Sequence, residues 1–458
     1  MSKEQAKPET AVADSAKIFA EVAERSSRIM GDFLERQAEA KDPGLSDEFG
    51  IGKAFMDMSA LMLAKPQQLA EAQMNMFRDY TRLWQNSWMQ MMGQKTEPVA
   101  APRKGDNRFR HEDWENHFLF DYVKQSYLIA ARHIHQAVSQ VENLPPEDRK
   151  KVDFFTRQYI DALSPSNFAL TNPEVVRETL ASGGQNLLRG LNNLLADIER
   201  GDGQLQISMT DPKAFKMGKN IATTPGKVVY QNDLMQLIQY QPSTKKVYKR
   251  PLLIIPPWIN KYYILDLRES NSFIKWAVDQ GHTVFVISWV NPGAEFAGKG
   301  FEDYLHQGPD DALAAIEKAS GEKQVNVIGY CLGGTLLGAA LGAMAAKKDT
   351  RVASATFFVS LLDFSIPGEL GVFIDEKQVE NLERRMNERG YLEGSEMAGT
   401  FNMLRSNDLV WSFVVNNYLM GKDPFPFDLL YWNSDSTRMP AKMHSFYLRN
   451  MYLANKLK

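Results

Sequence analysis

The sequence predicts an α/β fold whose parallel sheet is preceded by a long helical region. Two observations predict the sheet. From about residue 225 onward, short β-branched runs alternate with helix-like segments, and one of these runs leads through a glycine-rich turn into a helix. A third observation predicts the helical region, because residues 1–215 show helical spacing and helix start signals instead of strand patterns.

The expected strands are mostly continuous apolar runs, which is typical of strands buried on both faces of a sheet. They lie at residues 228–230, 252–255, 283–287, 325–328 and 356–359. Helix-like segments separate them, at residues 270–280 and 310–320. This alternation favours a parallel sheet joined by crossover helices.

The sequence Gly-Tyr-Cys-Leu-Gly at residues 329–333 has the pattern of a nucleophile elbow. It follows an apolar run and precedes a helix-like run at residues 332–347. The turn packs backbone against backbone, so Gly329 and Gly333 supply the small residues that it needs on either side of the nucleophile. Together with the strand–helix alternation, the elbow indicates an α/β-hydrolase-type core.

Cys331 occupies the reactive position of this elbow and is the only cysteine of the chain. The start of the following helix is expected to favour the thiolate, and the backbone N–H of Leu332 is expected to form half of an oxyanion hole. The alternative is a small buried core residue, as most unpaired cysteines are. The strand before, the helix after and the glycine spacing favour the nucleophile.

The chain is expected to form four parts. They are a helical N-terminal domain (1–215), the α/β core with the elbow (216–363), an inserted cap (364–440) and a short return to the core (441–458). Helix start signals at residues 65–66 and 171–174 support the first part, as does a leucine-rich helix at residues 185–200. After Asp363 the alternation stops, which favours the cap.

Residues 56–92 are unusually rich in methionine and tryptophan at helical spacing. We expect most of these side chains to pack into a core. The alternative is an exposed face for a hydrophobic partner, since flexible methionines adapt to irregular surfaces.

Composition excludes several classes of protein. The chain has 458 residues and a net charge of −3, which does not favour nucleic acid as a partner. One cysteine cannot form an intramolecular disulfide or a multi-thiolate metal site, and we expect neither metal nor cofactor. The N-terminus does not resemble a signal peptide, and the longest apolar run (336–346) is too short to span a membrane. A reduced, cytoplasmic location is therefore expected.

Further segments extend the pattern beyond the elbow. One of them, Pro-Pro-Trp-Ile-Asn-Lys-Tyr-Tyr at 256–263, directly follows an expected strand. Three more lie after the last expected strand: Leu-Leu-Asp-Phe at 361–364, Asn-Asp-Leu-Val-Trp at 407–411 and Asp-Leu-Leu-Tyr-Trp-Asn at 428–433. Nearer the N-terminus they include Asp-Asn-Arg-Phe at 106–109 and Pro-Ser-Asn-Phe at 165–168. This ordered series resembles the polyhydroxyalkanoate synthases, and most closely the class I type.

The resemblance implies an acyltransferase that polymerises (R)-3-hydroxyacyl-CoA, most simply 3-hydroxybutyryl-CoA. Cys331 would carry the growing polyester chain as a thioester, and CoA would be a leaving group, not a cofactor. The loop after the strand at 252–255 supplies the second oxyanion N–H in this fold, which points to Ile259. The family also implies a homodimer at the surface of cytoplasmic polyester granules. Many of its members have cysteine where this chain has Trp258.

One departure concerns the catalytic base. The triad of this fold runs nucleophile, acid, histidine along the chain, and His444 is the only histidine after Cys331. In the family the acid and the histidine lie beyond the segment that matches residues 447–449. We therefore expect His444 to be a packing or surface residue, the core to be incomplete at its C-terminus, and the activity and stability to be low.

Two alternatives to the polymerase stay open: a thiol hydrolase or depolymerase of the same fold, and a catalytically dead granule-binding fragment. Near the site, Asp266 and Asp363 are expected to have structural roles as a helix cap or turn former. Asn260 and Lys261 either line the CoA entrance or form a solvated loop.

Overall fold

The computed structural model describes residues 51–458, and by its internal contacts the chain divides into two compact units. The helical unit comprises the residues up to Ser208 together with Asn402–Pro424. The sheet unit comprises Met209–Phe401 and Phe425–Lys458. The expected domain limits at residues 215, 363 and 440 stay a prediction. The two compact units differ from the expected domains in one respect, because Asn402–Pro424 belong to the same unit as the N-terminal helices.

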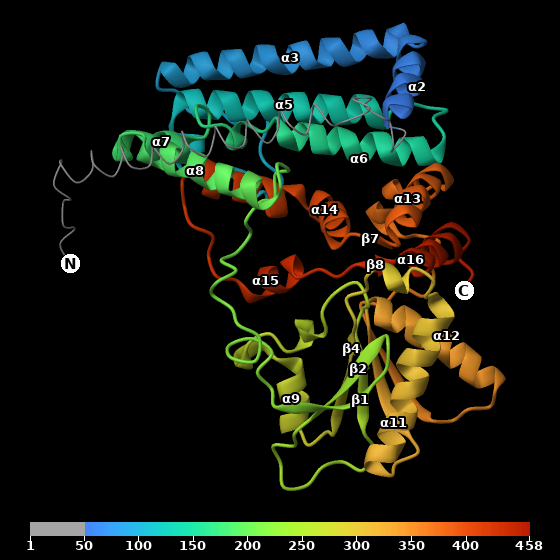
Figure 1. Ribbon diagram of the computed structural model, residues 1–458. Helices are drawn as coiled ribbons and strands as arrows, with labels where there is room; N and C mark the ends of the chain where they lie inside the picture. Colours follow the sequence, from blue (N-terminus) through green and yellow to red (C-terminus); the bar gives the residue numbers. More distant parts are fainter. Residues whose placement is uncertain (1–50) are drawn as a thin grey trace, which may run out of the picture. The chain divides into compact units, whose positions relative to one another are not determined.

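The helical unit begins its helices where the sequence predicts them. Pro66 is the first residue of its longest helix, and the Asn172 side chain caps another by accepting hydrogen bonds from the N–H groups of Glu174 and Val175. The helices are α2 (Ile51–Leu63), α3 (Pro66–Met91), α4 (Asp113–Asn116), α5 (Phe118–Ser139), α6 (Pro146–Ala162), α7 (Pro173–Ser182) and α8 (Gln185–Arg200) (Figure 1).

Residues 402–424 include two π-helical segments, Asn407–Trp411 and Val414–Leu419. The second of them packs against α8, which explains why these residues belong to this unit. The Asn186 amide donates to the Leu419 carbonyl at 2.8 Å, and the Tyr418 hydroxyl donates to Asp197 at 2.6 Å. A Cβ on Gly190 would lie 1.7 Å from the Tyr418 carbonyl oxygen, so the two backbones approach as closely as glycine permits.

The sheet unit contains a mixed six-stranded sheet in the order β1-β2-β4-β3-β5-β6. The parallel part expected from the sequence is confirmed for β3, β4, β5 and β6, whereas β2 pairs antiparallel with both β1 and β4. The strands are β1 (Gly226–Gln231), β2 (Met235–Tyr240), β3 (Leu252–Ile255), β4 (Val284–Trp289), β5 (Val325–Tyr330) and β6 (Val352–Phe358). Strand β2 was not expected.

Helices cover both faces of this sheet. Side chains of β3 and β4 alternate between two clusters, so that Leu253 packs on one face and Ile254 on the other. The first cluster includes α11 (Asp311–Ser320) and α12 (Leu332–Ala346), and the second includes α9 (Phe273–Asp279). Within the described residues β6 ends the sheet, and its five central residues are exposed, as expected for an edge.

The remaining elements of the sheet unit lie in its later part. They are α10 (Phe301–Leu305), α13 (Glu376–Arg389), a two-strand pair of β7 (Tyr391–Leu392) and β8 (Met439–Pro440), α15 (Asp428–Ser434), α16 (Ala441–Tyr447) and a π-helical segment, Leu448–Leu453. Helix α14 (Gly394–Leu404) contains the point where the chain passes from one unit to the other.

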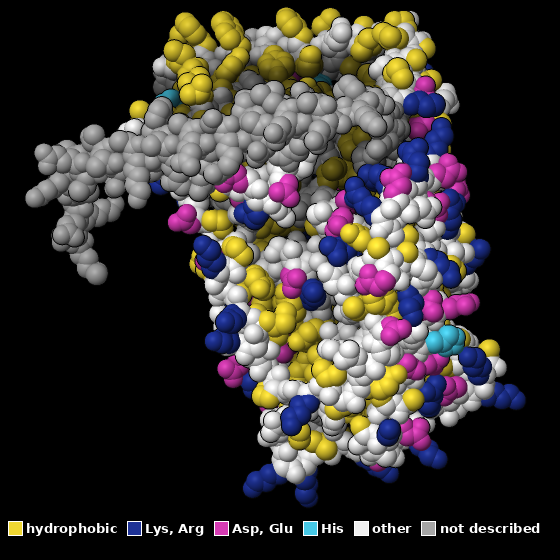
Figure 2. All heavy atoms as spheres, viewed as in Figure 1, with side chains coloured by type: hydrophobic (Ala, Val, Ile, Leu, Met, Phe, Trp, Pro, Cys, Tyr) yellow, Lys and Arg dark blue, Asp and Glu magenta, His cyan; other side chains and the backbone are white. Residues whose placement is uncertain are grey.

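The methionine- and tryptophan-rich stripe of α3 is only partly a core. Leu83 is buried, but Trp84, Trp88 and Met91 are 62%, 51% and 66% exposed. The expectation of core packing is therefore wrong for these three residues, because α5 covers only the other side of the helix. Figure 2 shows hydrophobic side chains gathered on this part of the surface.

Across residues 51–458, every helix is too short or too polar to cross a lipid bilayer.

Candidate active site at the nucleophile elbow

Cys331 lies at a sharp turn between β5 and α12, as the sequence predicts. Its backbone is strained, with φ of 53° and ψ of −121°, a conformation that L-residues rarely adopt. The turn is held by the Cys331 N–H, which donates to the Phe358 carbonyl at 2.9 Å, and by the Cys331 carbonyl, which accepts from the Gly334 N–H at 2.9 Å. A strained strand-to-helix turn of this kind presents the side chain above the sheet.

The glycines of the elbow are required by close backbone contacts. A Cβ on Gly329 would lie 2.5 Å from the Cα of Gly334, and one on Gly333 would lie 1.9 Å from the Ile255 carbonyl oxygen. The latter contact joins the start of α12 to the end of β3. The elbow is therefore packed against the loop that leads to Ile259.

The environment of the thiol differs from the expectation in one respect. Cys331 is half-buried, and burial raises the pKa of its thiol, although the hydrogen bond from the Leu332 N–H lowers it. The helix start thus favours the thiolate locally, as expected, but desolvation is the larger effect. The sequence expectation concerned the helix start alone and did not include the effect of burial.

Leu332 and Ile259 are both placed near the elbow. Leu332 is the first residue of α12, and its backbone N–H lowers the pKa of the Cys331 thiol. Ile259 is buried in the loop after β3, and its carbonyl accepts from the Thr437 N–H at 3.3 Å. The neighbouring Trp258 carbonyl accepts from the Thr437 hydroxyl at 3.1 Å. These contacts fix the loop, and the oxyanion role of the two N–H groups stays a prediction.

The two acids near the site have structural roles, as expected. Asp266 is buried and accepts hydrogen bonds from the hydroxyls of Thr224 and Ser272, each at 2.6 Å. Asp363 is in a turn, where it accepts from the Ser365 N–H at 3.0 Å and from Asn455 at 2.8 Å. Its ion pair with Lys458 is the largest cause that lowers its pKa.

The loop at residues 260–261 is tied to the segment before β8 and is not freely solvated. Asn260 forms a bridge with Ser436, and the Lys261 carbonyl accepts from the Trp432 indole at 2.8 Å. Both residues are half-buried. Whether they line a CoA entrance stays a prediction.

His444 is a packing residue, which is one of the two roles expected from the sequence. It lies in α16, it is fully buried, and its Nδ1 has no hydrogen-bond partner among the described residues. Burial lowers its pKa from 6.5 to about 4, and the Cys331 thiol is not among the causes. Within residues 51–458 no hydrogen bond joins this imidazole to the thiol, so His444 is not arranged as its base.

The buried imidazole predicts a stability effect in mild acid. The folded-state pKa of about 4 lies below the unfolded value of 6.5, so the unfolded chain binds the extra proton between these pH values. Stability therefore falls as pH decreases from 6.5 toward 4, by about 3 kcal/mol in total from this group. A His444→Leu variant should lose this part of the pH dependence in urea unfolding measured from pH 4 to 7.

The control for this prediction is His306→Gln, because the His306 side chain is 56% exposed and ion-paired with Asp310. Equal pH dependence in wild type and His444→Leu would show that the buried histidine is not the source of the acid sensitivity.

Two tyrosines that the sequence analysis did not single out share a hydrophobic cluster with the elbow. Tyr447 and Tyr452 belong to the same hydrophobic cluster as Cys331, and the charge of Cys331 raises the pKa of both, after the larger effect of burial. They come from α16 and the π-helical segment that follows it.

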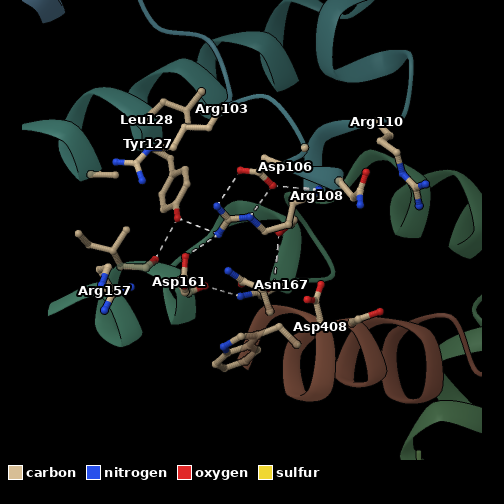
Figure 3. A pocket seen from close by; sticks show the side chains of 18 of the residues that line it. Arg103, Asp106, Arg108, Arg110, Tyr127, Leu128, Arg157, Asp161, Asn167 and Asp408 are labelled. Atoms are coloured by element: carbon tan, nitrogen blue, oxygen red, sulfur yellow. Dashed lines mark hydrogen bonds and ion pairs between the residues drawn. The ribbon is translucent and has the colours of Figure 1, made fainter. Parts of the chain in front are cut away.

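A separate pocket lies in the helical unit, with a volume of about 940 Å³ (Figure 3). The motif at residues 106–109 meets the motif at residues 165–168 there. The Arg108 guanidinium donates to Asp106 at 2.8 and 2.9 Å and to Asp161 at 2.9 Å. Burial acts to lower the pKa of Arg108, but these bonds hold it above its usual value. Because the charges of this network are paired with one another, we interpret it as structural.

Comparisons with known proteins agree with this architecture. Residues 105–277 match the family model described as "Poly-beta-hydroxybutyrate polymerase (PhaC) N-terminus", and residues 250–455 match the model of the alpha/beta hydrolase fold. These two matches meet at β3, so together they extend over both units.

Curated relatives match across nearly the whole chain. A poly(3-hydroxyalkanoate) polymerase of Methylorubrum extorquens is 52% identical over 90% of this chain and 68% of its own length. Polymerase subunits named PhaC are 51% identical in Rhizobium meliloti (88% of this chain, 66% of the relative) and 44% identical in Rhizobium etli (98% and 71%). The chain thus spans about two thirds of the length of these relatives, and it belongs to the poly(3-hydroxyalkanoate) polymerase family.

Proposed function

We propose that this chain carries out acyl transfer from 3-hydroxyacyl-CoA, with Cys331 as the nucleophile, and so polymerises hydroxyacyl units into a polyester. The observation that carries the proposal is the single cysteine at a strained strand-to-helix turn. The relatives are named poly(3-hydroxyalkanoate) polymerases, which supports the substrate class.

The proposed chemistry has two steps. The Cys331 thiolate attacks the carbonyl carbon of the acyl-CoA thioester, a new C–S bond forms, and the bond to CoA breaks so that the CoA thiolate leaves and takes a proton. The 3-hydroxyl of another acyl unit then attacks the enzyme-bound thioester. A C–O ester bond forms, the Cys331 C–S bond breaks, and the hydroxyl proton passes to a base.

The first step suits a cysteine. Exchange of one thioester for another is nearly balanced in free energy, and a thiol is intrinsically nucleophilic even when only a few per cent is ionised. The tetrahedral intermediate needs N–H donors at its oxyanion, which we assign to Leu332 and Ile259. This sequence of steps requires no cofactor, since the substrate brings its own leaving group.

The test is release of CoA from 3-hydroxybutyryl-CoA, followed together with the mass of Cys331. It should be run on this chain and on a version that carries the C-terminal residues of the relatives, where the resemblance places the acid and the histidine. Acylated Cys331 and polyester are the expected products. No CoA release by the longer version would end the proposal, and free 3-hydroxy acid in place of polymer would support the hydrolase alternative.

We also propose that the exposed stripe of α3 contacts the polyester surface of a cytoplasmic granule. Met74, Phe77, Trp84, Trp88 and Met91 recur three, four or seven positions apart, so they lie along one side of the helix over about 25 Å. A stripe of this kind suits an apolar polymer surface better than water. The homodimer implied by the resemblance stays a prediction.

A Trp84→Ser/Trp88→Ser double variant is expected to bind poly(3-hydroxybutyrate) granules at least about tenfold more weakly in co-sedimentation, because each buried tryptophan contributes on the order of 1.5–3 kcal/mol. The matched control is Trp276→Ser, which removes a 55% exposed tryptophan from α9. Equal binding by the double variant and the wild type would remove α3 as the contact surface.

A further inference from the structure

The edge of the sheet at which the parallel strands begin lies opposite the nucleophile elbow. Strands β4, β3, β5 and β6 run parallel, so the segments that precede them meet at this edge, whereas Cys331 directly follows β5. Strand β1 begins there too, because Gly226 pairs with Tyr240 at the end of β2, and β2 runs antiparallel to β4. The segments at this edge are residues 225–227, 241–251, 280–283, 320–324 and 347–351. The six residues of β5 separate the edge from the elbow by about 20 Å.

Hydrogen bonds hold the segments of this edge side by side. The Tyr248 N–H donates to the Gly281 carbonyl at 2.8 Å, which joins the segment before β3 to the segment before β4. The Arg250 guanidinium donates to the Gln324 side chain at 3.2 Å. The Gln324 amide in turn donates to the Thr350 carbonyl at 3.4 Å. The segments that precede β3, β4, β5 and β6 therefore form one continuous surface.

This edge carries a surplus of positive charge. Its segments contain nine basic residues and two acidic ones, although the chain as a whole has a net charge of −3. Eight of the basic residues are exposed, and we call these eight the basic edge: Lys227, Lys245, Lys246, Lys249, Arg250, Lys323, Lys347 and Lys348. The expectation against nucleic acid used the charge of the whole chain, which conceals this local surplus.

Acidic side chains neutralise little of the basic edge. Among the residues that the structure describes, seven of its eight members form no ion pair, and Lys249 lies 3.9 Å from Glu322. The other acidic residue of these segments is Asp349, which pairs with the half-buried Arg351 at 2.6 Å. Most of the positive charge is therefore free to attract an anionic partner.

A hollow of about 830 Å³ lies between the segments of this edge. Tyr248, Arg250, His282 and Lys323 are among the residues that line it, and the rings of Tyr248 and His282 lie 5.0 Å apart. Figure 2 shows dark blue lysine and arginine side chains projecting from this end of the sheet unit. An anionic backbone that enters the hollow would meet donors from three different segments at once.

The length of the basic edge favours an extended polyanion over a small phosphate. Six strands at a spacing of about 4.8 Å span about 24 Å from β1 to β6. Double-stranded DNA carries one charge per about 1.7 Å of its axis, so it offers phosphates along the whole row. Lysine is depleted at protein–protein interfaces, whereas interfaces with DNA are strongly positive. Nucleic acid is therefore a better match for this surface than an acidic protein.

We propose that the basic edge binds the phosphate backbone of double-stranded nucleic acid without sequence preference. Lysine ammonium groups act on phosphates as point charges, and such contacts carry no information about the bases. Bases are read in the major groove by a helix or a two-stranded ribbon, whereas this edge consists of loops. Because the elbow lies at the other end of β5, a bound duplex does not involve Cys331.

The test is the fluorescence anisotropy of a labelled DNA duplex of about 20 base pairs, titrated with the full chain between about 50 and 200 mM NaCl. The wild type is expected to bind with a Kd of about 1–100 μM at about 150 mM salt, the range of non-specific binding. The variants are Lys245→Gln/Lys246→Gln and Lys323→Gln/Lys347→Gln, which remove charge from different segments. Each should bind at least about tenfold more weakly at low salt, and the slope of log K against log salt should fall by about 1–2.

The matched control is Lys377→Gln/Lys442→Gln, which removes two exposed lysines from α13 and α16 and should bind as the wild type does. An equal loss in the control would show that only the net charge matters and would overturn the inference. Unchanged affinity in both edge variants, or a wild type that does not bind the duplex, would also overturn it. If one edge variant does not fold, the other decides by the same criterion.

Polyglutamate and phosphatidylglycerol vesicles are titrated in parallel with the duplex. Tighter binding to either of them than to the duplex would assign the edge to an acidic protein or to a membrane surface and would overturn the inference. Weaker binding to both would support nucleic acid as the partner. These titrations contain no acyl substrate, so their outcome is separate from that of the CoA-release assay.

Discussion

Replacing Cys331 with serine is expected to abolish acyl-enzyme formation, with a loss of at least about a thousand-fold in the rate of CoA release. The change alters one atom and leaves the strained turn intact. A serine hydroxyl does not ionise near neutral pH, and within the described residues no base forms a hydrogen bond with the side chain of residue 331 to activate it. His444 is buried, and its Nδ1 has no hydrogen-bond partner there. A thiol ionises far more readily than a hydroxyl and is intrinsically more nucleophilic. The measurement is the acyl adduct on residue 331 by mass spectrometry, beside the rate of CoA release.

The same samples provide the control. The serine variant should unfold at the same urea concentration as wild type, because the hydrogen bonds that form the turn involve only the backbone of residue 331. Continued acylation of a variant that lacks any thiol would place the nucleophile elsewhere and would remove the basis of the proposed acyl transfer at residue 331.

The features that could be predicted from sequence are those with a local signature. The elbow, with Gly329, Cys331 and Gly333, and the buried strands β3 and β5 are read from apolar runs and glycine spacing alone. Strand β2 was missed because its sequence, Met-Gln-Leu-Ile-Gln-Tyr, has no strong strand propensity. Its pairing with β4 stabilises it as a strand.

Two aspects of the site depend on tertiary contacts and could not be derived from spacing. The net effect on the Cys331 thiol depends on how far the surrounding cluster buries it, and the sequence shows only the favourable helix start. The ring contact between Tyr447 and Tyr452 depends on a π-helical turn, and a reading at α-helical spacing places the two rings apart. A pair of polar aromatics five residues apart beside an expected core return was the only available signal.

The second large effect is expected from Gly333→Ala, which adds one methyl group at the start of α12. The new Cβ would lie 1.9 Å from the carbonyl oxygen of Ile255 and 2.8 Å from that of Pro256. Both contacts are with backbone at the end of β3, in the middle of the sheet, so no flexible side chain can move aside. We expect a loss of about 3 kcal/mol or more in the free energy of unfolding, measured in urea.

Gly342→Ala is the matched control, since it makes the same chemical change further along the same helix, where nothing lies within 4 Å of the added Cβ. There alanine should stabilise the protein by about 0.5–1 kcal/mol through its higher helix propensity. The opposite signs of the two effects separate helix propensity from the close approach of α12 to β3. If Gly333→Ala were as stable as wild type, then the elbow would not be packed against the loop of Trp258 and Ile259. The proposed oxyanion role of the Ile259 N–H would then lose its structural support.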